Sequence, residues 1–137
     1  MTDGCAIDAL IAVTGEIPER NIALMRGTQL TTPLGRHPDF RSVAELYQRA
    51  AKNVSTPVGK KLNQMKMSAT RAVPDEIIAM TNQGKQVVVD IPEMRHMAKL
   101  APKPGGELFI QNNGEEGEDV GLIFDRKYRV FVFEEKK

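Results

Sequence analysis

The feature of this chain that most constrains its fold is a change in the period of its hydrophobic residues. Before Gly84, apolar side chains recur at the three- and four-residue spacing of amphipathic helices. After Gly84, β-branched and aromatic residues gather into short runs, of which residues 86–91 (QVVVDI) predict a buried strand. Helices followed by antiparallel strands are typical of the α+β class. We therefore expect N-terminal helices packed on a C-terminal antiparallel sheet of about five strands.

Capping residues and helix-starting prolines predict four helices in the first part of the chain. The first covers residues 4–14, and Gly15 would end it in the left-handed conformation. The others begin at Pro18, at Ser42 and at Pro74.

Turn-forming segments rich in Gly, Pro and Asn separate the predicted strands. The turn at residues 102–106 (PKPGG) would close one hairpin and the turn at residues 125–127 a second, with an acidic loop at residues 113–118 between them. Residues 27–38 and 53–72 are expected to be loops, and substrate choice would lie there. The predicted strands cover residues 86–91, 96–101, 107–112, 120–124 and 128–134.

Length and composition bound the class of protein. A chain of 137 residues has the usual size of one domain, so we expect a single domain over residues 1–137. Its 19 basic and 18 acidic residues give a net charge of +1, which argues against a nucleic-acid partner. No apolar run is long enough to cross a bilayer and no signal peptide is visible, so no membrane partner is expected. A single cysteine excludes an internal disulfide and a cysteine-based zinc site, and we expect no metal and no cofactor.

Cys5 is the candidate nucleophile. It follows Asp3 and Gly4 and would lie in the first turn of the first helix. The partial positive charge at a helix N-terminus stabilises a thiolate, which is the reactive form of cysteine. A free cysteine is also among the residue types most often buried, so a purely structural thiol remains the alternative.

His96 and Asn112 are the candidate base and the residue that would orient it. His96 would open a strand, where it can face a helix N-terminus packed on the same sheet. Alternation gives Asn112 the matching face of the returning strand, beside the imidazole. The alternatives are a satisfied surface histidine and ordinary Asn-Gly turn chemistry at residues 112–114, and a bulge would favour Asn113. The other histidine, His37, lies in an expected loop.

Four short segments together carry a family resemblance. They are residues 5–10 (CAIDAL), 86–91 (QVVVDI), 96–100 (HMAKL) and 106–114 (GELFIQNNG). The first looks like the nucleophile helix of the papain-like cysteine peptidase and deamidase superfamily, and the others resemble its catalytic hairpin. The likeness is greatest to leader-peptidase domains of bacteriocin exporters and to papain-fold toxin and effector domains of bacteria. It implies a papain-like fold and catalytic roles for Cys5, His96 and Asn112.

The chain departs from that family's pattern in two places. No Gln precedes Cys5 to donate to the oxyanion, so the donor that would act beside the Cys5 backbone N–H is not identified. Asn112 and Asn113 stand where the relatives often carry Asp-Pro. A start so close to the nucleophile also leads us to expect a domain excised from a larger toxin or effector.

The expected function is that of a thiol-dependent hydrolase acting on protein amide bonds, either a cysteine protease or a glutamine deamidase. Its expected partners are a protein substrate and a cognate immunity or inhibitor protein, in the cytoplasm or after transfer into a target cell. One alternative is a non-catalytic module that binds a protein through a sheet edge or a Met-rich surface. Another is a small ribonuclease toxin using His96 with Arg95, Arg129 or Lys127, although the near-neutral charge disfavours it.

Overall fold

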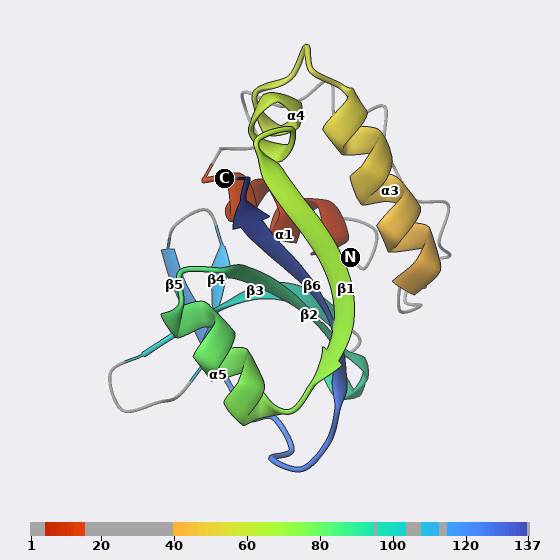
Figure 1. The fold of residues 1–137 in the computed structure, drawn as a ribbon. Helices are drawn as coiled ribbons and strands as arrows, with labels where there is room; N and C mark the ends of the chain where they lie inside the picture. Colours follow the sequence, from red (N-terminus) through yellow and green to blue (C-terminus); the bar gives the residue numbers. More distant parts are fainter. Residues whose placement is uncertain (1–4, 16–39, 95, 104–107, 113–114, 137) are drawn as a thin grey trace.

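The computed structural model describes residues 5–15, 40–94, 96–103, 108–112 and 115–136. Within these ranges the chain forms an α+β fold, as expected, in which helices cover both faces of an antiparallel sheet (Figure 1). The elements are α1 (Cys5–Thr14), α3 (Phe40–Lys52), α4 (Pro57–Leu62), β1 (Met65–Ala72), α5 (Pro74–Asn82), β2 (Gln86–Ile91), the 3-10 turn η3 (Pro92–Met94), β3 (His96–Pro102), β4 (Leu108–Asn112), β5 (Glu115–Val120) and β6 (Tyr128–Glu135).

The described residues form a sheet of six strands in the order β1-β6-β2-β3-β4-β5, and every neighbouring pair is antiparallel. Strands β2 to β5 follow one another as a meander. The last strand of the chain, β6, returns to lie between β1 and β2. The expected hairpin between residues 120–124 and 128–134 is therefore wrong, because β6 pairs with β1 and β2 and not with the segment just before it.

Three segments differ from the sequence prediction. Residues 53–72, expected to be a loop, contain the short helix α4 and the edge strand β1. Strand β5 begins at Glu115, inside the predicted acidic loop, and residues 122–124 form no strand. β1 escaped prediction because its sequence MKMSATRA has no aromatic residue and only one β-branched residue, Thr70.

Of the described helices, α1, α3 and α5 agree with their sequence signals, whereas α4 was not predicted. α1 ends before Gly15, whose φ of 72° is the left-handed conformation that glycine adopts at low cost. α5 begins at Pro74, and Gly84, with φ of 85°, follows its end. α3 begins at Phe40, slightly before the predicted start, and the helix predicted from Pro18 lies outside the described residues. Of the described helices, none is long and apolar enough to cross a membrane.

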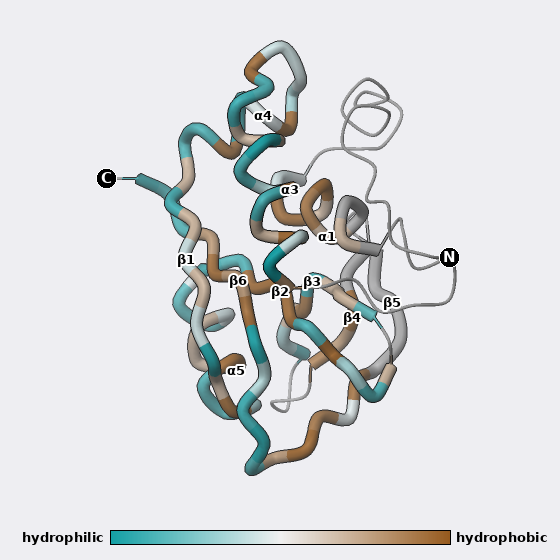
Figure 2. The backbone as a smooth tube through the Cα atoms, turned by 90° about the vertical axis from the view of Figure 1, so that its right-hand side faces the viewer, coloured by the Kyte–Doolittle hydropathy of each residue, from teal (hydrophilic) through white to brown (hydrophobic). Residues whose placement is uncertain are grey.

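The hydrophobic core has two parts, one on each face of the sheet. α1, α3 and α4 pack on the face that carries Val88, Met97 and Phe131. α5 packs on the opposite face, where Val89 and Leu100 lie. Figure 2 shows the hydrophobic stretches of the central strands between these helix layers. Because β2, β3 and β6 are buried on both faces, alternation assigns each of their residues to one helix layer or the other.

Candidate functional site

Cys5 is the first residue of α1, as the sequence predicts. α1 packs on β2, β3 and β4, and its first turn is tied to α3 by the Tyr47 hydroxyl, which donates to the Ala6 carbonyl at 2.7 Å. Tyr47 is fully buried, so this bond fixes the position of the turn. The side chain of Cys5 is not among those described. The backbone of Cys5 is described, and it lies at the start of α1.

His96 is the first residue of β3 and Asn112 is the last residue of β4, a neighbouring strand. The β3–β4 register pairs Leu100 with Ile110. The pairing ends there and reaches neither Ala98 nor Asn112, so the structure shows Asn112 at the end of the strand next to β3 without pairing it to a residue near His96. Ala98, Leu100 and Ile110 belong to one core cluster, so alternate residues of the two strands share a face as predicted. The Asn112 side chain itself is not among those described.

The structure places α1 on the other face of the sheet from the one that alternation assigns to His96. Met97 of β3 packs in the cluster that contains α1. His96 pairs across the sheet with Ile91, which belongs to the cluster of α5. The pleat of β3 therefore does not direct the His96 side chain toward the N-terminus of α1, contrary to the sequence-based expectation. His96 is half-buried and opens its strand, so a pair with Cys5 requires its imidazole to reach round the strand end.

The two candidates do lie toward the same end of the sheet. The last turn of α1, with Thr14 and Gly15, borders a hollow of about 300 Å³ together with Gln86 and Lys99, so α1 ends beside the part of the sheet where β2 begins. In Figure 1, α1 starts on the opposite side, where β2 ends and β3 begins. Cys5 and His96 therefore lie toward the same end of the sheet, but alternation assigns the His96 side chain to the face opposite α1.

The hollow beside the last turn of α1 is polar. Burial lowers the pKa of Lys99, which lies in this hollow on the α1 side of β3. The Thr14 hydroxyl is turned back onto the helix and donates to the Ile11 carbonyl at 2.8 Å. The hollow also borders Lys61 and Glu135, which carry charges of opposite sign.

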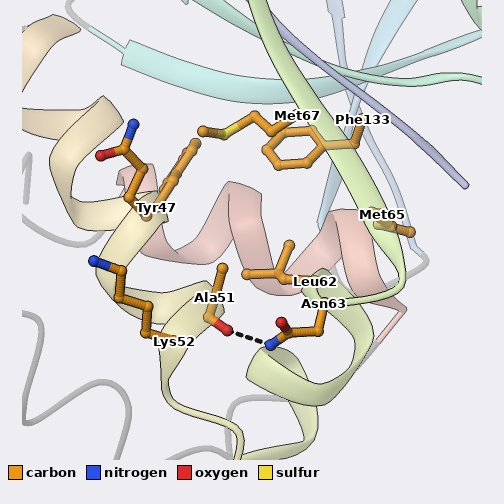
Figure 3. Close-up of a pocket in the computed structure, with 9 residues that line it drawn as sticks. Tyr47, Ala51, Lys52, Leu62, Asn63, Met65, Met67 and Phe133 are labelled. Carbon is orange, nitrogen blue, oxygen red and sulfur yellow. Dashed lines mark hydrogen bonds between the residues drawn. The ribbon is translucent and has the colours of Figure 1, made fainter. Parts of the chain in front are cut away.

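An apolar pocket of about 260 Å³ opens between α3, α4 and β1 (Figure 3). The buried Leu62 lines it together with Met65 and Met67 at alternate positions of β1, and the Met67 side chain extends toward Tyr47. The Asn63 side chain joins α4 to α3 by donating to the Ala51 carbonyl. The full lining is Tyr47, Gln48, Ala51, Lys52, Leu62, Asn63, Met65, Met67 and Phe133.

Sequence reasoning missed this pocket because it missed β1. Met65 and Met67 both pack partly against the core. Their spacing of two, next to the polar Lys66 and Ser68, is the strand period. That alternation was the signal that could have identified a half-buried edge strand.

Within the described ranges, no three His, Cys, Asp or Glu side chains come close enough together to hold a metal ion. Comparison of the chain with protein-family models, with curated proteins and with solved structures gave no match.

Proposed function

We propose that this protein is a thiol-dependent hydrolase of protein amide bonds, either a cysteine protease or a glutamine deamidase of bacterial toxin or effector type. It would act on a protein substrate, in the cytoplasm or after transfer into a target cell, and a cognate immunity or inhibitor protein would oppose it. The observation that carries the proposal is the placement of three elements. Cys5 opens α1, and α1 packs on β3 and β4, whose ends carry His96 and Asn112.

The chemistry follows from these roles. The Cys5 sulfur bonds to the amide carbon while His96 takes the thiol proton, and His96 then protonates the leaving amine or ammonia. Water, deprotonated by His96, hydrolyses the resulting thioester, which yields a carboxylic acid and regenerates the thiol. Asn112, at the end of the neighbouring strand β4, would accept from the second ring N–H of His96 through its side-chain oxygen and so fix the tautomer.

The first test is the rate of Cys5 alkylation by iodoacetamide as a function of pH. Cys5 is the only thiol in the chain, so the readout has a single source. We expect an apparent thiol pKa well below the ordinary value of about 8.5, and we expect His96→Ala to move it back toward that value. His37→Ala is the matched control, because it removes the only other histidine, and it should leave the curve unchanged.

A second measurement follows activity. The protein is incubated with labelled casein and with a glutamine-containing peptide, and new N-termini and released ammonia are measured. Cys5→Ser should abolish whichever product appears. Identical alkylation curves in the wild type and in His96→Ala would refute the pair, and would show that the sheet separates the two side chains as the alternation of β3 indicates.

A second candidate function, a non-catalytic protein-binding module, is favoured by a different observation. β1 is an edge strand: among the described strands only β6 pairs with it. An exposed edge can accept an extended segment of another protein as an added strand. Met65 and Met67 on this edge line the apolar pocket, so every second side chain of an added strand would face that pocket.

This binding function is tested with an isotope-labelled protein and a short peptide that alternates Leu with Thr. Saturable shifts of the backbone amide signals of residues 65–72 are expected, and Met67→Lys should remove them. Lys66→Gln, one position along on the same strand, should leave them unchanged. Shifts that are absent, or that spread evenly over the protein, would contradict strand addition at β1.

A further inference from the structure

A second hollow, of about 300 Å³, lies where β6 begins and β2 ends, and its lining is strongly basic. Four of its side chains are cationic and one is a carboxylate. The lining residues are Arg71, Asp90, Pro92, Arg126, Lys127, Tyr128 and Arg129. The chain as a whole carries a net charge of only +1, so this concentration of positive charge is a local feature of the fold.

Two of the arginines lie directly opposite one another. Arg71 of β1 and Arg129 of β6 are register partners, so their side chains leave the same face of the sheet. Like charges in directly opposite positions destabilise a pair of strands. The other end of the same ladder shows the favourable arrangement, because Lys66 lies opposite Glu134.

The carboxylates nearby do not balance this charge. Asp90 is 8% exposed and, one residue beyond the Val89–Val130 pair, the β2–β6 register places it opposite Arg129. Glu93 forms an ion pair with Arg126. Among the described residues that line the hollow, one buried carboxylate therefore faces several cations.

Aromatic rings hold two of the guanidinium groups in place. Arg126 lies over the ring of Tyr128 at 5.1 Å, and Arg129 lies over the ring of Phe40 at 5.7 Å. The Tyr128 hydroxyl in turn accepts from the Ile123 backbone N–H at 2.9 Å. Guanidinium groups positioned in this way lose less freedom when they bind an anion.

We propose that this hollow binds the phosphate group of a small phosphate ester or diphosphate. A phosphate dianion offers three acceptor oxygens, and guanidinium forks match them with paired hydrogen bonds. The volume is at the lower limit for ligand sites, which favours a compact ligand. The bound anion would offset the repulsion between Arg71 and Arg129, which otherwise destabilises the sheet. This site does not depend on Cys5, so the inference stands apart from the proposed hydrolase.

The test is a titration with inorganic pyrophosphate at constant ionic strength, followed by calorimetry and by the melting temperature. Wild-type protein should bind it saturably and melt at a higher temperature when it is bound. Arg71→Gln should weaken binding by about tenfold or more, because it removes a charge-assisted contact. Lys66→Gln is the matched control: it removes the same charge from the same strand, and binding should be unchanged.

Stability without ligand separates a binding defect from misfolding. Arg71→Gln removes the like-charged pair, so the free variant should melt at or above the wild-type temperature. Lys66→Gln removes the pair with Glu134, so it should melt at or slightly below the wild-type temperature. An Arg71→Gln protein that melts lower in the absence of ligand would overturn this account of the cluster.

Other ligands set the remaining outcomes. Equal stabilisation by citrate would overturn the phosphate assignment in favour of a general carboxylate site. Much tighter binding of a single-stranded RNA through the same arginines would overturn the assignment of this hollow to a small ligand. If Arg71→Gln and Lys66→Gln weaken pyrophosphate binding equally, or if the titration does not saturate, then binding reflects net charge alone and the proposed site is overturned.

Discussion

Gly59 offers the sharpest stability prediction, because the backbone at the α3–α4 junction leaves no room for a β-carbon. A β-carbon built at Gly59 would lie 2.6 Å from the carbonyl carbon of Asn53 and 2.9 Å from the carbonyl oxygen of Ala50, and it would contact the Asn53 oxygen more closely still. Ordinary contact begins at 3.4 Å. The two backbone segments would have to separate by more than an ångström.

That separation also disturbs hydrogen bonds. The Asn53 carbonyl accepts from the Thr56 backbone N–H at 3.2 Å and from its hydroxyl at 2.9 Å, and the same hydroxyl accepts from the Gly59 N–H at 3.1 Å. Overpacking alone costs about 1–3 kcal/mol, and each impaired hydrogen bond adds about 1 kcal/mol. Replacing glycine by alanine in a helix stabilises it by about 1 kcal/mol. We therefore expect Gly59→Ala to lower the free energy of unfolding by about 3 kcal/mol.

Urea unfolding followed by circular dichroism measures this difference. Gly121→Ala is the matched control, since a β-carbon there meets nothing within 4 Å, and its free energy of unfolding should stay within about 0.5 kcal/mol of wild type or rise slightly. A Gly59→Ala protein within about 1 kcal/mol of wild type would refute the close approach of α4 to the end of α3. A large loss would also show that this junction, which forms one wall of the apolar pocket, depends on a glycine.

Three further predictions concern the packing of α1 and β3, and urea unfolding checks each of them. Tyr47→Phe should lower the free energy of unfolding by about 1 kcal/mol, because it removes the hydroxyl bond to Ala6 and keeps the ring; an unchanged value would contradict that bond. Met97→Ala, under α1, should cost about 2–5 kcal/mol, whereas Met94→Ala, at a site that is 41% exposed, should cost less than about 0.5 kcal/mol; equal effects would contradict the packing. Burial lowers the pKa of Lys99, so its charged form destabilises the fold near neutral pH, and Lys99→Met should be more stable than wild type there. That advantage should shrink as the pH rises through the lowered pKa toward the ordinary value of 10.5, because the unfolded chain then binds more protons than the folded one; a pH-independent difference would refute the cause.

The strands that could be predicted from the sequence are those whose own side chains form the core. Val87, Val88 and Val89 are fully buried on both sides of the sheet, so β2 appears in the sequence as a continuous β-branched run. β1 lies at the edge, and most of its side chains are exposed. Its stability comes from pairing with β6, and such a partner cannot be identified from the sequence of β1 itself.

The position of β6 shows a second limit. Neighbouring strands in a sequence usually pair, so a turn at residues 125–127 suggested a hairpin with the residues just before it. In the fold, β6 instead pairs with β1, far earlier in the chain. The signal lay in its burial pattern: Val130 and Val132 serve one core cluster, and Phe131 and Phe133 serve the other. Apolar residues at consecutive positions indicate a central strand with helices on both faces.

The sequence predicted which helix or strand carries each candidate residue, but not the face of the sheet on which α1 packs. The sequence located Cys5 at a helix start, His96 at a strand start and Asn112 at a strand end, and the secondary structure agrees with all three positions. It could not say which face of β3 would receive α1. That choice is made by Met97, which packs with α1 and so gives the alternate residues of β3 to the cluster of α5.

Because α1 is buried, the pKa of the Cys5 thiol distinguishes a core thiol from one paired with His96. Ala6 and residues 9–14 are all buried, so α1 is a core helix and not an amphipathic surface helix. Burial raises the pKa of a thiol, because it disfavours the charged form, whereas a helix N-terminus with a nearby imidazolium lowers it. The two accounts of Cys5 therefore predict shifts of opposite sign. A thiol that titrates above about 8.5 is part of the core, and one that titrates well below this value, and loses the shift in His96→Ala, has its imidazole within reach despite the alternation of β3.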